Sequence, residues 1–430
     1  MDCLARMEKM MQDVFIIGSR GLPARYGGFE TFVSELINHQ KSSDIKYQDV
    51  FIIGSRGLPA RYGGFETFVS ELINHQKSSD IKYHVACLSD KEHHTHFNFA
   101  DADCFTINPP QLGPARVIAY DIMAINYALD LVKTHDLKEP IFYILGNTIG
   151  AFIWHFANKI HKVGGLLYVN PDGLEWKRSK WSRPIQRYLK YAEKCMTKNA
   201  DLIISDNIGI ENYIQTTYSN VKTRFIAYGT EINSRKLSSD DPRVKQLFKK
   251  WNIKSKGYYL IVGRFVPENN YETAIREFMA SDTKRDLVII CNHQNNPYFE
   301  KLSLKTNLQQ DKRVKFVGTL YEKDLLDYVR QKAFAYIHGH EVGGTNPGLL
   351  EALANTDLNL VLDVDFNKSV AGLSSFYWTK KEGNLAKLIN DSDQQQDLST
   401  YGDRAKAIIQ ENYTWKKIVE EYEDLFLNES

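Results

Sequence analysis

Glycines, an asparagine and a carboxylate gather in the motif HGHEVGGTNPGLLEAL, which follows an apolar strand and opens a helix. Asn346 suits the N-cap of that helix, and Pro347 suits its first position, where no backbone N–H is needed. Gly343 and Gly344 let the backbone approach a ligand closely, so the amides at the helix start can bind an anion, most simply a diphosphate. Glu351, one turn further, can accept hydrogen bonds from sugar hydroxyls. An ordinary loop and cap, with a solvated Glu351, is the alternative.

Arg264 stands in a second motif of this kind, VGRFVPENNYETAIREF, where a strand again leads through a loop into a helix. At the end of its strand, the guanidinium would point into a cleft, where it can clamp a phosphate. A surface ion pair with Glu268 or Glu272 is the alternative that the pattern leaves open.

A third motif is the glycine-rich turn GSRGLPARYGGFE at 54–66. It lacks the G-x-G-x-x-G spacing and the acidic residue that the dinucleotide fingerprint requires. Its backbone amides can still hold an anion, with Arg56 and Arg61 nearby. A simple tight turn is the alternative.

A fourth motif, YVNPDGLEWKRSKW, ends a strand in a polar loop at 168–181. Asp172 and Glu175 are candidates to orient or deprotonate an acceptor hydroxyl, and the alternative is ordinary turn chemistry at Asn-Pro-Asp-Gly.

Residues 176–198 hold eight lysines and arginines and one acid, with tryptophans and tyrosines interleaved. On a helix, five of the basic residues share one face: Arg183, Arg187, Lys190, Lys194 and Lys198. This pattern suggests a surface attracted to anionic lipid headgroups or to a lipid diphosphate, and a solvated basic helix is the alternative. The residues that we assign to an acceptor or a membrane surface are Glu175, Trp176, Lys177, Arg178, Lys180, Trp181, Arg183 and Arg187.

Each of these motifs follows an apolar run that predicts a strand. Such runs alternate with helical patterns along the chain, which is typical of a parallel sheet. The expected strands are VFII (50–53), HVACL (84–88), IFYIL (141–145), GLLYV (165–169), DLIIS (201–205), TRFIAY (223–228), YYLIVG (258–263), DLVIIC (286–291), VKFVG (314–318), AFAYIHG (333–339) and NLVLD (359–363). The alternation predicts an α/β protein with two Rossmann-like, doubly wound domains facing a cleft, with ligands at the carboxyl ends of the strands.

Residues 12–47 recur letter for letter at 48–83. Each copy predicts a strand, a turn and a helix, but a parallel sheet has a single first-strand position. The second copy continues directly into the strand at 84–90, so we expect the second copy in the sheet. Met11 is the competing observation, because it suits a start codon directly before the first copy.

The composition excludes several classes of protein. Fifty-four lysines and arginines against 53 aspartates and glutamates leave a net charge of +1, which argues against a nucleic-acid binder. Five scattered cysteines without C-x-x-C spacing predict neither a zinc site nor a disulfide framework. The start lacks the apolar core of a signal peptide, and no apolar run of about 18 residues is present. We therefore expect a cytosolic globular protein.

With these motifs placed, the chain resembles the retaining glycosyltransferases of family 4, which have the GT-B fold. Within that family it is similar to the bacterial rhamnosyltransferases of capsule and cell-wall polysaccharide assembly, of the β-1,4 type. The resemblance covers nearly the whole chain beyond residue 47 and rests on GSRGLPARYGGFETF, VNPDGLEWKRSKW, AYGTEI, VGRFVPENNYE, GHEVGGTNPGLLEA and YTWKKIVEEYE.

The resemblance implies the division of the chain and the roles of the site residues. It implies an extra N-terminal segment over 1–47, an acceptor-binding domain over 48–233, a linker over 234–256, a nucleotide-sugar-binding domain over 257–410 and a C-terminal helix over 411–430. The donor would be dTDP-L-rhamnose, with its diphosphate on Arg264 and its ribose on Glu351. The donor contacts would be Gly63, Gly64, Arg264, Gly343, Gly344, Thr345, Asn346 and Glu351, and the catalytic residues Asp172, Arg264 and Glu351.

By the same resemblance, no metal or other cofactor is expected. The acceptor would be a lipid-diphosphate-linked saccharide at the inner face of the cell membrane, where the protein would bind peripherally. Two positions depart from the common family pattern: Gly343 stands where a glutamate often precedes Glu351, and Asn269 where a lysine often follows Arg264. We interpret both as traits of the rhamnosyl subgroup.

The sequence is also compatible with other functions. A transferase for another nucleotide sugar and a sugar-nucleotide epimerase share this fold, and only the epimerase needs no acceptor. A non-catalytic, membrane-associated scaffold that binds nucleotide is the alternative outside the enzymes.

Overall fold

The computed structural model describes residues 47–60, 64–91, 95–178, 180–232, 237–395 and 398–428. Residues 48–430 form one compact unit. The first copy of the repeat, which we assigned to an extra N-terminal segment, lies outside the described residues. The second copy contributes the first strand and the first helix of the described fold.

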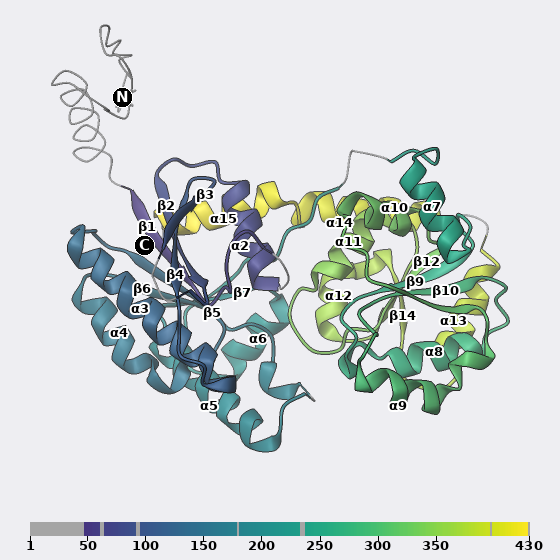
Figure 1. The fold of residues 1–430 in the computed structure, drawn as a ribbon, viewed down its shortest axis with the longest axis horizontal. Helices are drawn as coiled ribbons and strands as arrows, with labels where there is room; N and C mark the ends of the chain where they lie inside the picture. The colour runs from purple at the N-terminus through teal and green to yellow at the C-terminus, as the bar shows by residue number, and fades with distance from the viewer. Residues whose placement is uncertain are drawn as a thin grey trace, which may run out of the picture. The chain divides into compact units, whose positions relative to one another are not determined.

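An eight-stranded sheet forms the centre of the N-terminal domain (Figure 1), in the order β3-β4-β2-β1-β5-β6-β7-β8. All neighbouring strands pair in parallel except β3 and β4, which are antiparallel. The strands are β1 (Gln48–Ile53), β2 (Ile81–Leu88), β3 (His96–Phe99), β4 (Ala102–Ile107), β5 (Ile141–Leu145), β6 (Leu166–Asn170), β7 (Leu202–Ser205) and β8 (Thr223–Phe225). Strand β1 has neighbours on both sides, so the second copy fills the first-strand position.

Helices cover both faces of this sheet. They are α2 (Gly64–Asn74), α3 (Arg116–Thr134), α4 (Ile153–Lys162), α5 (Arg183–Asn199) and α6 (Ile208–Thr217), with short 3₁₀ turns η1 (Gly113–Ala115), η2 (Gly150–Phe152) and η3 (Glu175–Lys177). In α2, Phe68, Val69, Leu72 and Ile73 recur at helical spacing and are all buried against the sheet.

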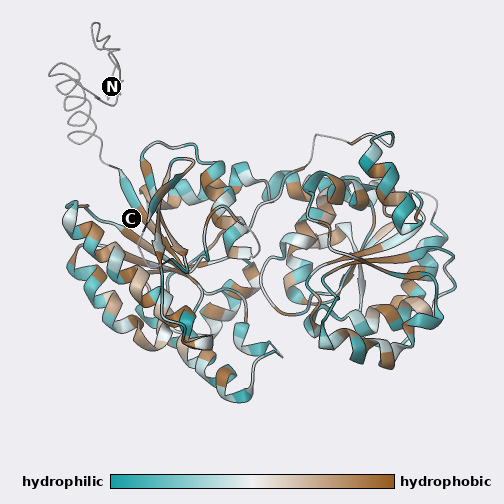
Figure 2. Ribbon diagram, in the orientation of Figure 1, coloured by the Kyte–Doolittle hydropathy of each residue, from teal (hydrophilic) through white to brown (hydrophobic). Residues whose placement is uncertain are grey.

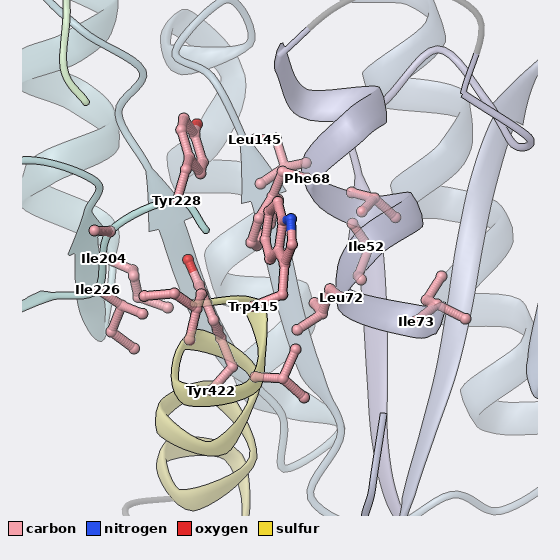
Figure 3. Close-up of a cluster of buried hydrophobic side chains, with 14 of the residues drawn as sticks. Ile52, Phe68, Leu72, Ile73, Leu145, Ile204, Ile226, Tyr228, Trp415 and Tyr422 are labelled. Atoms are coloured by element: carbon pink, nitrogen blue, oxygen red, sulfur yellow. The ribbon is translucent and has the colours of Figure 1, made fainter. Parts of the chain in front are cut away.

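The C-terminal helix α15 (Trp415–Asn428) belongs to the core of the N-terminal domain. Figure 3 shows Trp415 and Tyr422 pointing from this helix toward Phe68, Leu72 and Tyr228. The Tyr422 and Tyr143 hydroxyls lie 3.0 Å apart. The chain passes from one domain to the other twice, after Thr230 and before Trp415. The backbone N–H of Thr230 donates to the carbonyl oxygen of Tyr413 at 2.7 Å, so these two connecting segments lie side by side.

The C-terminal domain is built on a six-stranded parallel sheet in the order β11-β10-β9-β12-β13-β14. Its strands are β9 (Tyr258–Val262), β10 (Asp286–Ile290), β11 (Val314–Gly318), β12 (Ala335–His338), β13 (Asn359–Leu362) and β14 (Phe376–Trp378). Its helices are α7 (Pro242–Trp251), α8 (Tyr271–Met279), α9 (Pro297–Thr306), α10 (Lys323–Lys332), α11 (Pro347–Asn355), α12 (Asp365–Ala371), α13 (Asn384–Asp393) and α14 (Ser399–Asn412), with 3₁₀ turns η4 (Pro267–Asn269), η5 (Leu308–Gln310) and η6 (Gly372–Ser374).

The segment 234–256, which we expected to be a linker, contains helix α7. Trp251 at its end and Ile253 are buried in one cluster with Tyr258 and Leu260 of β9. This part of the chain therefore packs as an outer layer of the C-terminal domain.

Hydropathy follows this layering (Figure 2): apolar residues concentrate on the strands and on the sheet-facing sides of the helices. In the part of the chain that the structure describes, no helix has both the length and the apolar composition needed to cross a membrane.

Candidate active site

The chain order of both sheets reverses at their centre, and in the C-terminal domain this switch lies between β9 and β12. Ligands of doubly wound sheets bind outside the carboxyl ends of the strands at such a point. Arg264 follows β9, and the loop at 339–346 follows β12. The Asn346 side chain accepts a hydrogen bond from Gly348 N at 2.9 Å and Pro347 is the first residue of α11, which confirms the predicted cap.

A small basic pocket lies beside this switch point. Its lining residues are Arg178, Lys180, Arg264, Val266, Glu268, Asn269, His340 and Val342. Arg264 is exposed there, and it meets two basic residues of the loop at 168–181 from the other domain. Arg178 and Lys180, which we had assigned to an acceptor or a membrane surface, thus lie with the predicted diphosphate-binding arginine.

Glu175 holds these two basic residues in place. Its carboxylate forms ion pairs with Arg178 Nε at 2.5 Å and Lys180 Nζ at 2.7 Å, and it accepts from Trp181 Nε1 at 2.9 Å. Three donors of the same loop thus share this one carboxylate. Glu175 therefore positions the basic pocket.

Asp172 lies in the same loop, in a left-handed backbone conformation with φ of 58°. Its N–H donates to Asn170 Oδ1 at 2.9 Å, which forms the predicted turn. Burial raises the pKa of the Asp172 carboxyl, while the Arg178 guanidinium opposes that rise and Arg264 opposes it more weakly. Asp172 and Arg264 therefore belong to one electrostatic cluster.

Asp206, at the carboxyl end of β7, is a site residue that sequence reasoning missed. It is 3% exposed, its Oδ1 has no hydrogen-bond partner, and burial, with the Asp172 carboxylate adding to it, raises its pKa to about 7. The sequence did carry a signal for it: Asp206 and Asn207 stand between the strand LIIS and a helix, where ligands of such sheets bind.

The glycine loop of the C-terminal domain contacts this acidic residue and the loop of Asp172. A Cβ on Gly344 would stand 2.0 Å from Asp206 Oδ1, and a Cβ on Gly173 would stand 2.5 Å from the Cα of Gly343. Gly343 has φ of 143°, which favours glycine. Thr345 is buried, and its hydroxyl donates to the backbone carbonyl of Asp206. The predicted donor-binding loop thus also joins the two domains.

His340 completes the basic pocket as a neutral side chain. Asn269 donates through Nδ2 to the Arg264 carbonyl at 2.8 Å, so its Oδ1, 2.9 Å from His340 Nδ1, accepts from that nitrogen. Burial lowers the pKa of His340 well below its ordinary value. Asn269 therefore orients an uncharged imidazole beside Arg264.

Glu351 lies on α11 but outside the basic pocket. It forms an ion pair with Arg330, whose side chain is 3% exposed, while the Glu351 side chain is 37% exposed. Arg330 also pairs with Asp327 at 3.2 Å. Glu351 therefore neutralises a buried arginine, and it is not among the residues that line the basic pocket with Arg264.

Two predicted donor contacts come from the glycine-rich turn. Gly63 lies outside the described residues. Gly64 is the first residue of α2, and the space beside its Cα is open. Within the same turn, the N–H of Arg56 donates to Glu66 Oε1 at 2.9 Å.

Helix α5 includes all five basic residues that we expected on one face, and Lys190 lies at the edge of that face. Its Nζ lies 3.0 Å from Glu193 Oε1 and 4.6 Å from the centre of the Trp176 ring. Because it pairs with buried Glu193, its side chain is only 36% exposed. The exposed basic residues of the helix are Arg183, Arg187, Lys194 and Lys198.

A larger cavity of about 770 Å³ lies on the other side of Val342. It is lined by Lys177 and the first half of α6 in one domain, and by residues between 363 and 369, which include the start of α12, in the other. Asp363 and Asp365 stand directly after strand β13, and this Asp-Val-Asp sequence was the signal that could have located them.

Glu71, His75 and Glu231 bring their ligand atoms within 4.8 Å of one another, a grouping that could hold a metal ion. Lys323 Nζ, however, lies 2.6 Å from Glu231 Oε2, so an ammonium already supplies positive charge there.

Two Rossmann-like domains that place polar loops from both sheets at one site define a GT-B fold, as the sequence predicted. Solved structures with this fold include sucrose-phosphate synthase of Thermosynechococcus elongatus (TM-score 0.70, 16% identity, 88% of this chain and 98% of that chain). They also include Anabaena HepE in complex with UDP (TM-score 0.65, 14% identity, 88% and 98%).

The chain belongs to the family described as the domain of unknown function DUF1972, whose model matches residues 11–48 and 47–231, more than half of the chain. The second match runs without a break through the second copy of the repeat. A curated relative, an uncharacterized glycosyltransferase of Methanocaldococcus jannaschii, is 26% identical over 255 residues. That alignment spans 56% of this chain and 61% of the relative.

Proposed function

We propose that the protein is a retaining glycosyltransferase that moves L-rhamnose from dTDP-L-rhamnose to a lipid-diphosphate-linked saccharide, in capsule or cell-wall polysaccharide synthesis. The observation that carries the proposal is the convergence of Arg264, Arg178 and Lys180 beside the glycine loop, at the carboxyl ends of β9 and β12. Such a pocket suits a diphosphate, because two guanidinium groups and an ammonium face one small volume.

The relatives support the coarser part of this proposal. One is named a glycosyltransferase, and HepE binds UDP on the same fold. The choice of dTDP-L-rhamnose and of a lipid-linked acceptor rests on the resemblance of the sequence motifs to the rhamnosyltransferases.

Transfer would proceed by breaking the bond between the anomeric carbon and the diphosphate oxygen. The charge that develops on the leaving diphosphate would be stabilised by Arg264, Arg178 and the N-terminus of α11, groups that are already oriented before the reaction. The acceptor hydroxyl would attack on the face that the diphosphate leaves, and its proton would pass to the departing phosphate oxygen, which retains the configuration.

Asp172 and His340 would act on the sugars. Asp172 can accept a hydrogen bond from an acceptor hydroxyl and orient it. His340 is uncharged, so it can contact a sugar without adding to the positive charge that holds the diphosphate.

The outer face of the N-terminal domain suits a membrane surface. Helix α5 exposes Arg183, Arg187, Lys194 and Lys198 with Tyr191, and the neighbouring η2 and α4 expose Phe152 and Trp154. Basic residues attract anionic headgroups, and exposed aromatic rings suit the headgroup layer. A peripheral position at the inner membrane face would bring a lipid-linked acceptor to the site.

The test is transfer from dTDP-L-rhamnose to a lipid-diphosphate glucose acceptor, with UDP- and GDP-sugars in parallel. Arg264→Ala should lower turnover at least a hundredfold, while Arg276→Ala, an exposed arginine of α8, should leave it within twofold. Near-normal transfer by Arg264→Ala would contradict the role of the pocket. A product formed without acceptor would indicate an epimerase, and nucleotide binding without turnover would favour the scaffold.

A further inference from the structure

The cavity of about 770 Å³ differs in chemistry from the basic pocket, although Val342 lines both. Three carboxylates line it, Glu341, Asp363 and Asp365, against a single lysine, Lys177. Because Lys380 and Lys368 pair with Glu341 and Asp363, the charges around the cavity nearly cancel and offer no net positive charge to a phosphate. The cavity therefore suits an uncharged ligand, and its volume falls within the range of about 300–1,000 Å³ that small-molecule sites occupy.

The carboxylates keep acceptor capacity that a polyhydroxylated ligand can use. Glu341 and Asp363 are paired with Lys380 and Lys368 respectively. Asp365 is exposed and has no ion-pair partner among the described residues. Glu341 also accepts from Asn270 Nδ2 at 3.2 Å. Because an ionised carboxylate accepts at about four positions, each of the three keeps room for sugar hydroxyls.

Apolar and amide groups on the other walls complete this chemistry. Phe366, Val342, Leu174 and Ile208 supply apolar surface, and the exposed Asn212 of α6 supplies an amide. Small-molecule sites are of this kind, mostly apolar with a few polar groups that fix orientation.

Both domains build the cavity, and one asparagine ties its walls together. Asn207 caps α6 by accepting from Gly209 N at 2.8 Å. Its Nδ2 lies 3.3 Å from both the Phe366 carbonyl and the Ser369 hydroxyl of the other domain. These hydrogen bonds hold the walls from the two domains against each other.

We propose that this cavity binds the acceptor as a neutral hexopyranoside, with the carboxylates of the C-terminal domain, Asp365 above all, accepting hydrogen bonds from its hydroxyls. The inference rests on the proposed sugar transfer and deepens it, since a domain expected to bind only the donor also selects the acceptor. Lys177 and Arg178, adjacent in sequence, then face the acceptor and the donor diphosphate respectively.

The test measures binding to the full chain, without turnover. The probes are octyl β-D-glucopyranoside, followed by ligand-observed NMR, and dTDP, followed by calorimetry. Asn212→Trp fills the cavity, and Asp365→Asn removes one acceptor charge. Thr217→Trp, on the exposed end of the same helix, and Asp324→Asn, an exposed first-turn aspartate of α10, are the matched controls.

We expect both cavity variants to weaken glucoside binding about tenfold or more, which corresponds to the loss of one or two hydrogen bonds or of the space for the ring. The controls should stay within twofold, and all four variants should bind dTDP as the parent does. Weakened dTDP binding in Asn212→Trp would overturn the proposal in favour of a nucleotide site. Absent or variant-independent glucoside binding would also overturn it. If cavity-dependent binding is found but no donor is turned over, the inference stands and the proposed transferase fails.

Discussion

The carboxylate of Asp206 lies against the Cα of Gly344, with only 2.0 Å between its Oδ1 and the position that a Cβ of residue 344 would take. The two residues come from different domains: Asp206 directly follows β7, and Gly344 lies in the loop after β12. The glycines of the loop at 339–346 are therefore required for contact between the domains.

Gly344→Ala should lower the free energy of unfolding by about 2 kcal/mol or more, because the new methyl group overlaps the Asp206 carboxylate. Adding Asp206→Ala removes the overlapping atoms and should restore part of the loss, a coupling that a double-mutant cycle in urea would measure. Strictly additive losses would show that the overlap is absent in solution.

Asp206 should also make stability depend on pH. Its folded-state pKa of about 7 lies above the ordinary value of 3.8, mainly because burial disfavours the charged form. The folded state therefore binds the extra proton between these values, and its stability falls as the pH rises from about 4 through 7. Asp206→Asn should match the parent at pH 4 and exceed its free energy of unfolding at pH 8 by up to about 4 kcal/mol. Parallel curves for the two proteins would contradict this expectation.

Glu351→Ala should lower the free energy of unfolding while leaving nucleotide affinity nearly unchanged. Removing this partner leaves the buried Arg330 with Asp327 alone, and because Glu351 is partly exposed we expect a loss of about 1–3 kcal/mol. The dTDP affinity should change less than threefold. The double variant Arg330→Met/Glu351→Leu should recover stability. A large loss of dTDP affinity without destabilisation would instead support the ribose contact that the resemblance implies.

Deleting residues 12–47 should leave the fold intact. The described sheet takes its first strand from Gln48–Ile53, which pairs with β2 and β5 on its two sides. The shortened chain should therefore show an unchanged or higher Tm and unchanged dTDP binding. Loss of cooperative unfolding after the deletion would show that the first copy is part of the folded unit.

The strands and the helix cap were predictable because short-range physics determines them. Buried parallel strands are continuous apolar runs, so IFYIL and NLVLD stand out in the sequence, and Asn346-Pro347 is a local helix start. Short or partly polar elements, such as β3 and β14, gave no such run and were missed.

The site was only partly predictable, because its contacts cross between the domains. Arg264 and Asp172 were proposed from their places at strand ends, but nothing in the sequence relates Asp206 to Gly344. The contact of Lys190 with Tyr213 and the ion pair of Glu351 with Arg330 each join two different helices, so the sequence did not predict them either.

Because α15 packs on the N-terminal sheet, residues from both sides of the C-terminal domain in the sequence build the N-terminal domain. In space, the C-terminal domain is an insertion within the N-terminal one, entered after Thr230 and left before Thr414, where the two passages pair. An N-terminal fragment that ends shortly after Thr230 would therefore lack α15, the helix that covers Phe68 and Tyr143. The N-terminal domain therefore needs chain from both sides of the C-terminal domain, residues 48–230 and 414–428.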